Sequence, residues 1–219
     1  MAVKTYSLKK DGATKLSPHF RVREFTCPDS DTVKIDPKLI AILERLYDYL
    51  GCSKIIITSG YRTPAYDRKV GGSGRGYHTE GRAADVNCWR GDSRIHGSEI
   101  CCALQELGWH HGIGWIAGHA VHVDTRTARY WFDEQNGNRS IGGDWYAYME
   151  EKGHHVPRLA KGDVDGDGKV TSTDARLALQ AAVGKVTLTE KQAIAADQNG
   201  DGTVDSTDAR QILQRAVKK

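Results

Sequence analysis

The first clear pattern of apolar positions lies in the segment DPKLIAILERLYDYLG, from Asp36 to Gly51. Apolar side chains recur there at the spacing of one helical face, at Leu39, Leu43, Leu46 and Leu50. This pattern predicts an amphipathic helix. Asp36 is a suitable N-cap and Pro37 suits the first turn, so we expect the helix to begin there and to end at Gly51.

Short apolar runs predict four strands in the next part of the chain. They lie at Lys54–Thr58, at Ala83–Val86 and in the segments HGIGW and AVHVDTR. The first is expected to be a buried strand that leads into the glycine-rich loop SGYRTPAYDRKVGGSGRGYH, and a second helix is expected near Ser98–Leu107. Helices packed on a small mixed or antiparallel sheet belong to the α+β class.

The periodicity weakens between Arg126 and Gly162, where NGN and GG are turn signals. The aromatic residues of this segment are expected to cover a core rather than to bind a ligand. They include Trp131, Trp145 and Tyr146. The segment HHVPRLAKG is expected to contain a linker.

A twelve-residue acidic pattern occurs twice near the end of the chain, as DVDGDGKVTSTD and DQNGDGTVDSTD, 34 residues apart. The spacing is that of a calcium loop, in which the sixth residue, Gly168 or Gly202, makes a sharp turn around the ion. The predicted ligands are Asp163, Asp165, Asp167, Lys169 and Asp174 in the first copy, and Asp197, Asn199, Asp201, Thr203 and Asp208 in the second. Two structural Ca²⁺ ions are therefore expected.

Each loop runs into a helical pattern, STDARLALQAAVG or STDARQILQRAV. The segment LTEKQAIAA predicts a helix before the second loop, but only a linker precedes the first. This disfavours the helix-loop-helix pair of a calcium sensor. The repeat instead predicts a small all-α domain, whose folding depends on calcium because so short a segment buries little apolar surface.

Composition excludes several classes of protein. The net charge is +3, and the acidic and basic residues are spread along the chain, so no nucleic-acid partner is expected. No apolar run reaches the length of a membrane span, and the start MAVKTYSLKKDG lacks the apolar core of a secretion signal. The five cysteines show no paired metal-type spacing and are expected to be buried free thiols.

His78, Asp85 and His122 form the most informative constellation. They lie in HTEGRAAD and in the later HAVHVD. Two imidazoles and a carboxylate can hold one catalytic zinc, which leaves a fourth position for water and lowers the pKa of that water. A loop and two neighbouring strands would let the three side chains converge. Asp124 is a candidate to accept the second N–H of a ligand histidine.

The motifs SGYR, HTEGRAAD and HVDTR resemble the zinc peptidases of family M15, the D-alanyl-D-alanine carboxypeptidase and endolysin type. The resemblance covers roughly residues 5 to 130 and implies His78, Asp85 and His122 as the zinc ligands. It also implies that Arg62 orients the substrate's peptide or its carboxylate. A guanidinium suits that task through bidentate hydrogen bonds, and it could also polarise the scissile carbonyl. Ser59 and Tyr61 of the same motif are implied substrate contacts.

His119 stands where several relatives have a carboxylate that acts as general base. An imidazole can accept a proton near pH 7, so one interpretation is that His119 is the base. The alternatives are an orienting donor and a surface residue. Gly76 replaces a serine that many relatives have two positions before the first histidine.

The two calcium loops and their following helices resemble a type I dockerin, a module that binds cohesin modules of scaffoldin proteins. The resemblance implies a cohesin-contact pair in each copy: Ser172 and Thr173, and Ser206 and Thr207. Because STDAR recurs intact, either helix could present nearly the same surface. The alternative is that these hydroxyl groups cap the helices.

Together the resemblances divide the chain into an M15-like domain (1–150), a linker (151–160) and a dockerin (161–219). They imply a zinc peptidase that acts on peptidoglycan stem peptides, as a carboxypeptidase or an endopeptidase, and is bound to a scaffold outside the cell. The alternative is a catalytically inactive wall-peptide binder carried by a dockerin. The serine and carboxylate missing at Gly76 and His119 favour that alternative.

Overall fold

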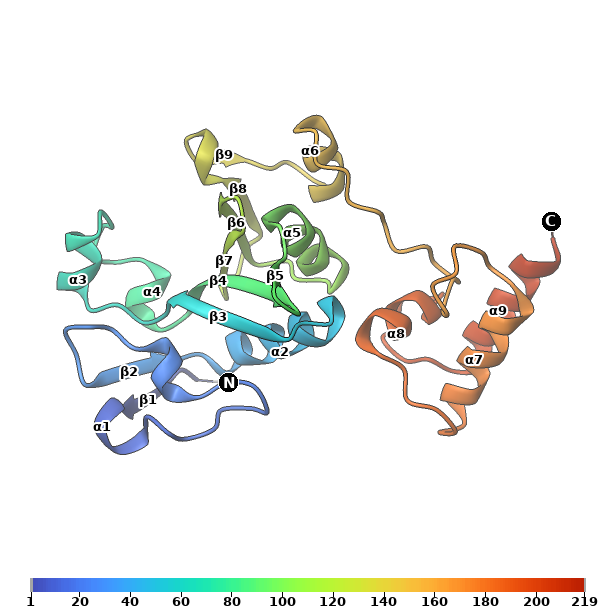
Figure 1. The fold of residues 1–219 in the computed structure, drawn as a ribbon, viewed down its shortest axis with the longest axis horizontal. Coiled ribbons are helices and arrows are strands. Elements are labelled where there is room, and N and C mark those ends of the chain that lie inside the picture. The colour runs from blue at the N-terminus through green and yellow to red at the C-terminus, as the bar shows by residue number, and fades with distance from the viewer. Residues whose placement is uncertain (1, 219) are drawn as a thin grey trace. The chain divides into compact units, whose positions relative to one another are not determined.

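The computed structural model describes residues 2–218. It divides into two compact units, the first ending at Val156 and the second beginning at Pro157 (Figure 1). The division falls inside the segment 151–160. The domain boundaries of the preceding section stay a prediction.

The predicted first helix is confirmed as α2 (Pro37–Leu50). The side chain of Asp36 accepts a hydrogen bond from the backbone N–H of Lys38, which satisfies one of the free donors of the first turn. Gly51 ends the helix in the left-handed conformation, with φ of 60°, which glycine adopts without strain. The second predicted helix is α5 (Gly97–Glu106), capped by His96.

The sheet of the first unit is mixed, which confirms the α+β class. Among the described residues it has seven strands in the order β3-β4-β7-β6-β8-β9, with β5 paired to β4. The pair β6–β8 is parallel and the other pairs are antiparallel. The strands are β3 (Lys54–Ser59), β4 (Ala83–Arg90), β5 (Ser93–Arg94), β6 (Gly112–Ala117), β7 (Ala120–Asp124), β8 (Tyr130–Asp133) and β9 (Arg139–Ser140).

The prediction that β3 is a buried strand is wrong. β3 lies at the edge of the sheet, its residues alternate in burial, and the side chain of Ile56 is 41% exposed. A short apolar run fits an edge strand as well as a central one, because the sequence does not show how many neighbours a strand has.

Several short elements of the first unit are not indicated by any strong local pattern in the sequence. A separate two-stranded sheet joins β1 (Lys4–Ser7) to β2 (Thr32–Ile35). Near it lie α1 (Leu8–Asp11) and the 3-10 turn η1 (Val22–Phe25). The predicted glycine-rich loop contains two helices, α3 (Pro64–Lys69) and α4 (Tyr77–Glu80).

The aromatic residues after Arg126 are buried, as predicted. Trp131, Trp145 and Tyr146 have exposed fractions of 2%, 0% and 8%. Trp131 lies on β8 and the other two on α6 (Trp145–Glu151), which contacts α5. The 3-10 turn η2 (Glu134–Asn136) follows β8.

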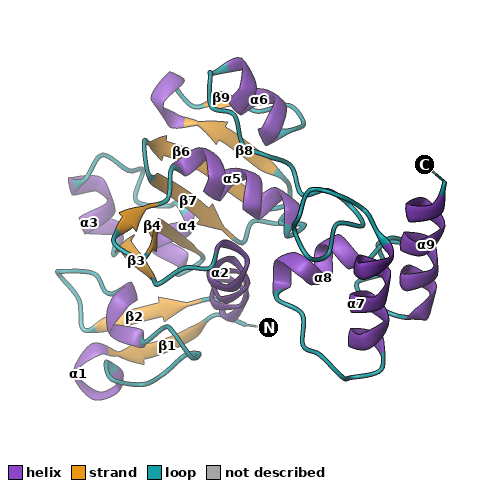
Figure 2. Ribbon diagram, turned by 45° about the vertical axis from the view of Figure 1, so that its right-hand side comes forward, coloured by secondary structure: helices purple, strands orange, loops and turns teal. Residues whose placement is uncertain are grey.

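The central strands have two different faces. Val86 on β4 and Val121 on β7 are directly paired and fully buried, and α2 and α5 pack against this part of the sheet (Figure 2). Side chains alternate along a strand, so Asp85 and His122 point to the other face. That face carries half-buried polar groups and is where we locate the candidate site.

The second unit is helical. It contains α7 (Ser172–Ala182), α8 (Glu190–Ala196) and α9 (Ser206–Val217), and α7 contacts α9. Its core is a small cluster of buried residues, namely Val164, Ala175, Ala178, Ala196, Ala209 and Ile212. So few apolar side chains supply little folding free energy.

All five cysteines are buried and free, as the sequence predicts: Cys27, Cys52, Cys88, Cys101 and Cys102. Within residues 2–218 no helix combines the length and the apolar character needed to cross a membrane.

Truncation of Ile113 should destabilise the first unit. Ile113 is fully buried on β6, so Ile113→Ala should lower the free energy of unfolding by about 2–5 kcal/mol. Ile56→Ala on the exposed edge is the matched control and should change it by at most about 0.5 kcal/mol. All five tryptophans lie before Val156, so their fluorescence in denaturant reports on this unit. Equal losses would contradict the assigned core.

Candidate metal centre

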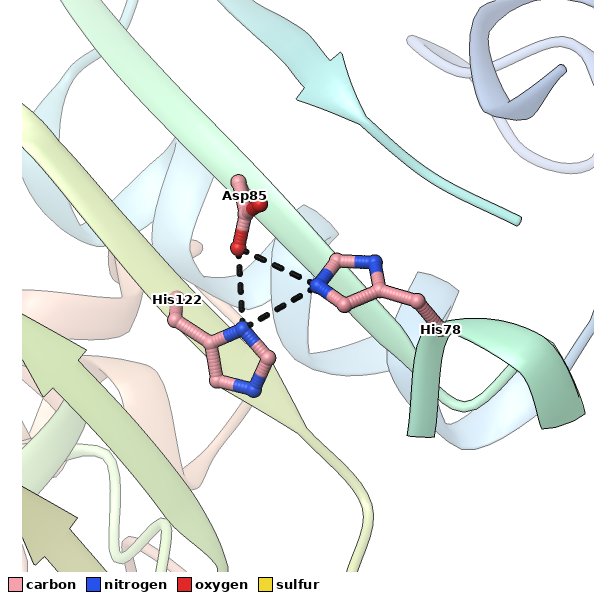
Figure 3. A group of neighbouring side chains, drawn as sticks. All are labelled: His78, Asp85 and His122. Carbon is pink, nitrogen blue, oxygen red and sulfur yellow. Dashed lines mark hydrogen bonds and ion pairs between the residues drawn. The ribbon is translucent and has the colours of Figure 1, made fainter. Parts of the chain in front are cut away.

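The structure brings His78, Asp85 and His122 together (Figure 3). Asp85 on β4 is directly paired with His122 on β7, and both side chains point to the same face of the sheet. Asp85 Oδ1 lies 2.8 Å from His122 Nδ1 and 3.3 Å from His78 Nε2. The two imidazole nitrogens are 3.3 Å apart. One oxygen and two nitrogens therefore surround a single point.

His78 reaches this point from the one-turn helix α4 rather than from a loop. Gly81 ends α4 with φ of 73°, and a Cβ there would lie 2.4 Å from the backbone of Lys34. Only glycine fits both the backbone angle and the close approach. The chain can therefore turn from α4 directly into β4, which carries Asp85.

The second nitrogen of each imidazole is held by a protein acceptor. His78 Nδ1 lies 2.7 Å from the carbonyl oxygen of Gly60, and His122 Nε2 lies 3.0 Å from Asp124 Oδ2. These bonds keep His78 Nε2 and His122 Nδ1 turned toward Asp85. Two oriented imidazoles and a carboxylate fit the ligand set of a catalytic zinc, and the role predicted for Asp124 matches its position.

The charges of the cluster are strongly coupled. Burial raises the pKa of Asp85, but hydrogen bonds to His122 and His78 outweigh this effect, and the pKa lies well below its usual value. Burial lowers the pKa of His122, but bonds to Asp124 and Asp85 raise it to about 9. At neutral pH Asp85 is therefore ionised and His122 is protonated, so a metal that binds here must displace a proton from His122.

Arg62 lies beside the cluster, and each of its three guanidinium nitrogens bonds to the protein. Its Nη2 lies 3.0 Å from Asp85 Oδ2, its Nη1 lies 3.2 Å from Asp67 Oδ1, and its Nε donates to Ser59 Oγ at 2.7 Å. In this structure Arg62 and Ser59 therefore position Asp85. The Arg62 side chain is 20% exposed, and its contact with substrate stays a prediction.

Tyr61 and His119 are not brought to the cluster. Tyr61 is 6% exposed, and its ring faces Lys34. His119 lies on the turn between β6 and β7, where its Nδ1 is 3.0 Å from the carbonyl oxygen of Ile95 and its ring contacts His96. The substrate contact predicted for Tyr61 and the base role predicted for His119 gain no support from this placement.

The two acidic loops of the second unit have matching hydrogen-bond patterns. Asp163 accepts from the backbone N–H groups of Gly166 and Gly168, and Asp197 accepts from those of Gly200 and Gly202. The final aspartates fold back in the same way, Asp174 onto Val164 and Asp208 onto Gln198. Gly168 and Gly202 have φ of 85° and 84°, as the sharp turn requires.

The remaining predicted calcium ligands line the same loops. Carboxylate oxygens of Asp163, Asp165 and Asp174 all lie within 4.8 Å of one another. In each copy the fifth residue accepts from the backbone N–H of the seventh, and the pairs are Asp167 with Lys169 and Asp201 with Thr203. Asn199 contributes an amide oxygen in the second copy, bonded to the N–H of Asp201.

The predicted contact pairs lie at the starts of α7 and α9. Thr171 and Asp205 cap these helices, so the alternative that Ser172, Thr173, Ser206 and Thr207 are the caps is wrong. Ser172 and Ser206 border a mostly apolar groove of about 390 Å³ between the two helices. Its other lining residues are Ala175, Arg176, Leu179, Ala209, Arg210 and Leu213.

Three residues near the cluster were missed by sequence reasoning. Phe132 of β8 packs over Gly114, where a Cβ would lie 2.2 Å from its ring, and its ring centroid lies 5.8 Å from that of His122. Arg126 is bonded to Asp124, and Tyr77 lies under Arg126. Arg126 is part of the HVDTR motif, but spacing alone did not indicate its partner.

A mixed sheet that gathers two imidazoles and a carboxylate on one face is the arrangement of a metal-dependent hydrolase, and the paired acidic loops are those of a calcium-binding module. Comparison with protein families agrees: residues 18–124 match Peptidase M15, and residues 161–217 match the dockerin type I domain. The chain therefore has an M15 peptidase domain followed by a type I dockerin domain.

M15 peptidases depend on zinc, dockerins bind calcium, and a dockerin implies a cohesin partner. No match was found among curated proteins or among solved structures.

Removing the acceptor of His122 should weaken zinc binding. Asp124→Asn keeps the shape of the side chain but loses the charge that holds His122 Nε2, so zinc affinity should fall about 10–100-fold. Competition with a chromogenic chelator measures the affinity. Asp92→Asn, an exposed change, is the control. Unaltered affinity in Asp124→Asn would refute this role.

Proposed function

We propose that the first unit is a zinc peptidase that hydrolyses peptide bonds in peptidoglycan stem peptides. The observation that carries the proposal is the convergence of His78 Nε2, His122 Nδ1 and Asp85 Oδ1, with the second nitrogen of each imidazole already held. The match to Peptidase M15 supports the reaction class. Peptidoglycan is proposed from the resemblance to wall-acting members of that family.

His78, Asp85 and His122 would hold the zinc, and the face of the sheet leaves them partly open to solvent, with side-chain exposures of 9%, 13% and 13%. When bound, zinc would polarise the scissile carbonyl and lower the pKa of a water molecule beside it. Arg62 holds Asp85 Oδ2, so that Oδ1 remains directed at the two imidazoles. Phe132 forms an apolar wall beside His122.

Hydrolysis is tested by incubating the zinc-loaded chain with purified peptidoglycan and identifying new peptide termini by mass spectrometry. We expect zinc-dependent products that are absent with Asp85→Ala. Sedimentation with the same peptidoglycan separates the second candidate, an inactive wall-peptide binder. Binding without any new terminus would favour that candidate and refute the enzyme.

We also propose that the second unit attaches the peptidase to a cohesin-bearing scaffold outside the cell. The groove between α7 and α9 supports this, because it is lined by the same residue types from each copy of the repeat. Leu179 and Leu213 are 46% and 44% exposed and occupy equivalent positions. Such a duplicated apolar surface favours binding in two orientations.

Altering one Ser-Thr pair should therefore leave cohesin binding nearly intact. Two double variants test this, one with Ser172 and Thr173 changed to alanine and one with Ser206 and Thr207 changed. Each should reduce cohesin binding only slightly, because the other helix remains available. Changing both pairs should weaken calcium-dependent capture by a cohesin panel by at least about tenfold, or 1.4 kcal/mol. Unchanged binding in the fourfold variant would rule out this surface.

A further inference from the structure

Arg126 lies two residues beyond β7, beside the candidate metal centre. Its Nε and Nη2 donate to the carboxylate of Asp124, and Asp124 Oδ2 in turn lies 3.0 Å from His122 Nε2. The guanidinium carbon lies 4.7 Å from the ring centroid of Tyr77 and 4.6 Å from that of Tyr130. Two rings and a carboxylate therefore fix the plane of this guanidinium.

The arginines around the cluster differ in how their donors are used. Arg62 directs all three guanidinium nitrogens at side chains of the first unit. Arg82 likewise uses all three, on Glu80 and Thr125. Arg126 uses Nε and Nη2 only, and within residues 2–218 its Nη1 has no hydrogen-bond partner.

The Arg126 side chain is partly exposed to solvent. The side chain is 18% exposed, and Tyr130 beside it is 39% exposed. A fixed guanidinium with unused N–H groups is a donor site for a carboxylate, and a hydrogen bond between two charged groups is about twice as strong as a neutral one. The carboxylate of Asp124 bonds to His122 as well as to Arg126, so it does not fully neutralise the charge of Arg126.

We propose that Arg126 binds a carboxylate of the peptide substrate. The inference rests on the proposed peptidase function and adds a specificity determinant to it. Arg126 is joined to the cluster through Asp124, because His122 presents Nδ1 to Asp85 and Nε2 to Asp124. The carboxylate would therefore bind beyond the His122 ring and not at the metal position itself. It is either the terminal α-carboxylate or the side-chain carboxylate of an acidic residue.

Equilibrium binding of matched peptides tests this inference separately from hydrolysis. Isothermal titration calorimetry of the zinc-loaded full chain would compare acetyl-Lys-D-Ala-D-Ala as free acid and as amide, each with a ketomethylene group in place of the D-Ala–D-Ala amide so that it cannot be hydrolysed. A second pair would be amidated peptides with an internal glutamate or glutamine. We expect the carboxylate form of one pair to bind at least about tenfold more tightly than its neutral form. The pair that shows the preference identifies the source of the carboxylate.

Arg126→Gln should abolish the preference, whereas Arg129→Gln, which removes an exposed charge nearby, should retain it. Zinc content and the unfolding midpoint report whether Arg126→Gln is folded. If it is not, Arg126→Lys serves instead: its ammonium can pair with Asp124 but offers no second fixed donor edge, so the preference should also be lost. Equal binding of both forms by the unaltered protein, or a preference that survives in the Arg126 variants, would overturn the inference. A preference without hydrolysis would leave it standing and refute only the peptidase.

Discussion

Asp85→Ala should abolish zinc binding by the first unit. Asp85 supplies the only carboxylate oxygen of the three-residue cluster, and its Oδ1 lies within 3.3 Å of both imidazole nitrogens. Without it only two imidazoles remain, which do not make a catalytic zinc site. The loss of zinc affinity should exceed the about 10–100-fold cost of removing an outer partner such as Asp124.

Metal analysis after dialysis measures this effect directly. The unaltered chain should retain one zinc ion in the first unit, and Asp85→Ala should retain none there. Excess calcium is added to both proteins first, so that any zinc bound in the acidic loops of the second unit is displaced. Asp92→Ala, an exposed aspartate on the turn after β4, is the matched control and should bind like the unaltered protein. Tryptophan fluorescence establishes that the variant is folded. Full zinc content in folded Asp85→Ala would exclude Asp85 as a ligand.

Removal of calcium should unfold the second unit and leave the first unit intact. The core around Ile212 is small, and the carboxylates of Asp163, Asp165 and Asp174 lie within 4.8 Å of one another, where they repel without a cation. A ligand present at 100 times its dissociation constant stabilises a fold by about 2.7 kcal/mol per site. Two sites would thus supply a large part of the stability of so small a unit.

Hydrogen exchange resolved by segment measures this response. In a calcium chelator with excess magnesium, α7 and α9 should lose protection, whereas α2 and α5 should keep it. The tryptophan fluorescence of the first unit should not change, since the second unit contains no tryptophan. Protected α7 and α9 without calcium would contradict a structural role for the ion.

The sequence predicts the elements whose signal is local. The leucine spacing and the Asp36 and Gly51 caps define α2 without tertiary information. The fixed spacing of aspartate and glycine likewise defines the two acidic loops, because all the groups of each loop come from twelve consecutive residues. His78, Asp85 and His122 were predicted from motif resemblance, and the sheet register then places them together.

What the sequence does not predict depends on long-range packing. β1 and β2 are four residues each and pair across the chain, and β3 has a neighbour on one side only. Arg62 bonds to Asp67 on α3 and to Asp85 on β4, and Arg126 contacts the rings of Tyr77 and Tyr130. A motif shows the residue type but not which of its donors remain without a partner. The exposure of Tyr61 is likewise set by its neighbours, including Lys34.

Anomalous diffraction at the zinc absorption edge tests the central claim most directly. Crystals of the chain with calcium and one equivalent of zinc should show a strong zinc peak on the open face of the sheet, with His78 Nε2 and His122 Nδ1 at about 2.0–2.1 Å and an oxygen of Asp85 at about 2.0–2.2 Å. The acidic loops should show no zinc. A zinc peak at other residues, or no peak at this cluster, would contradict the assignment of the first unit as a zinc peptidase.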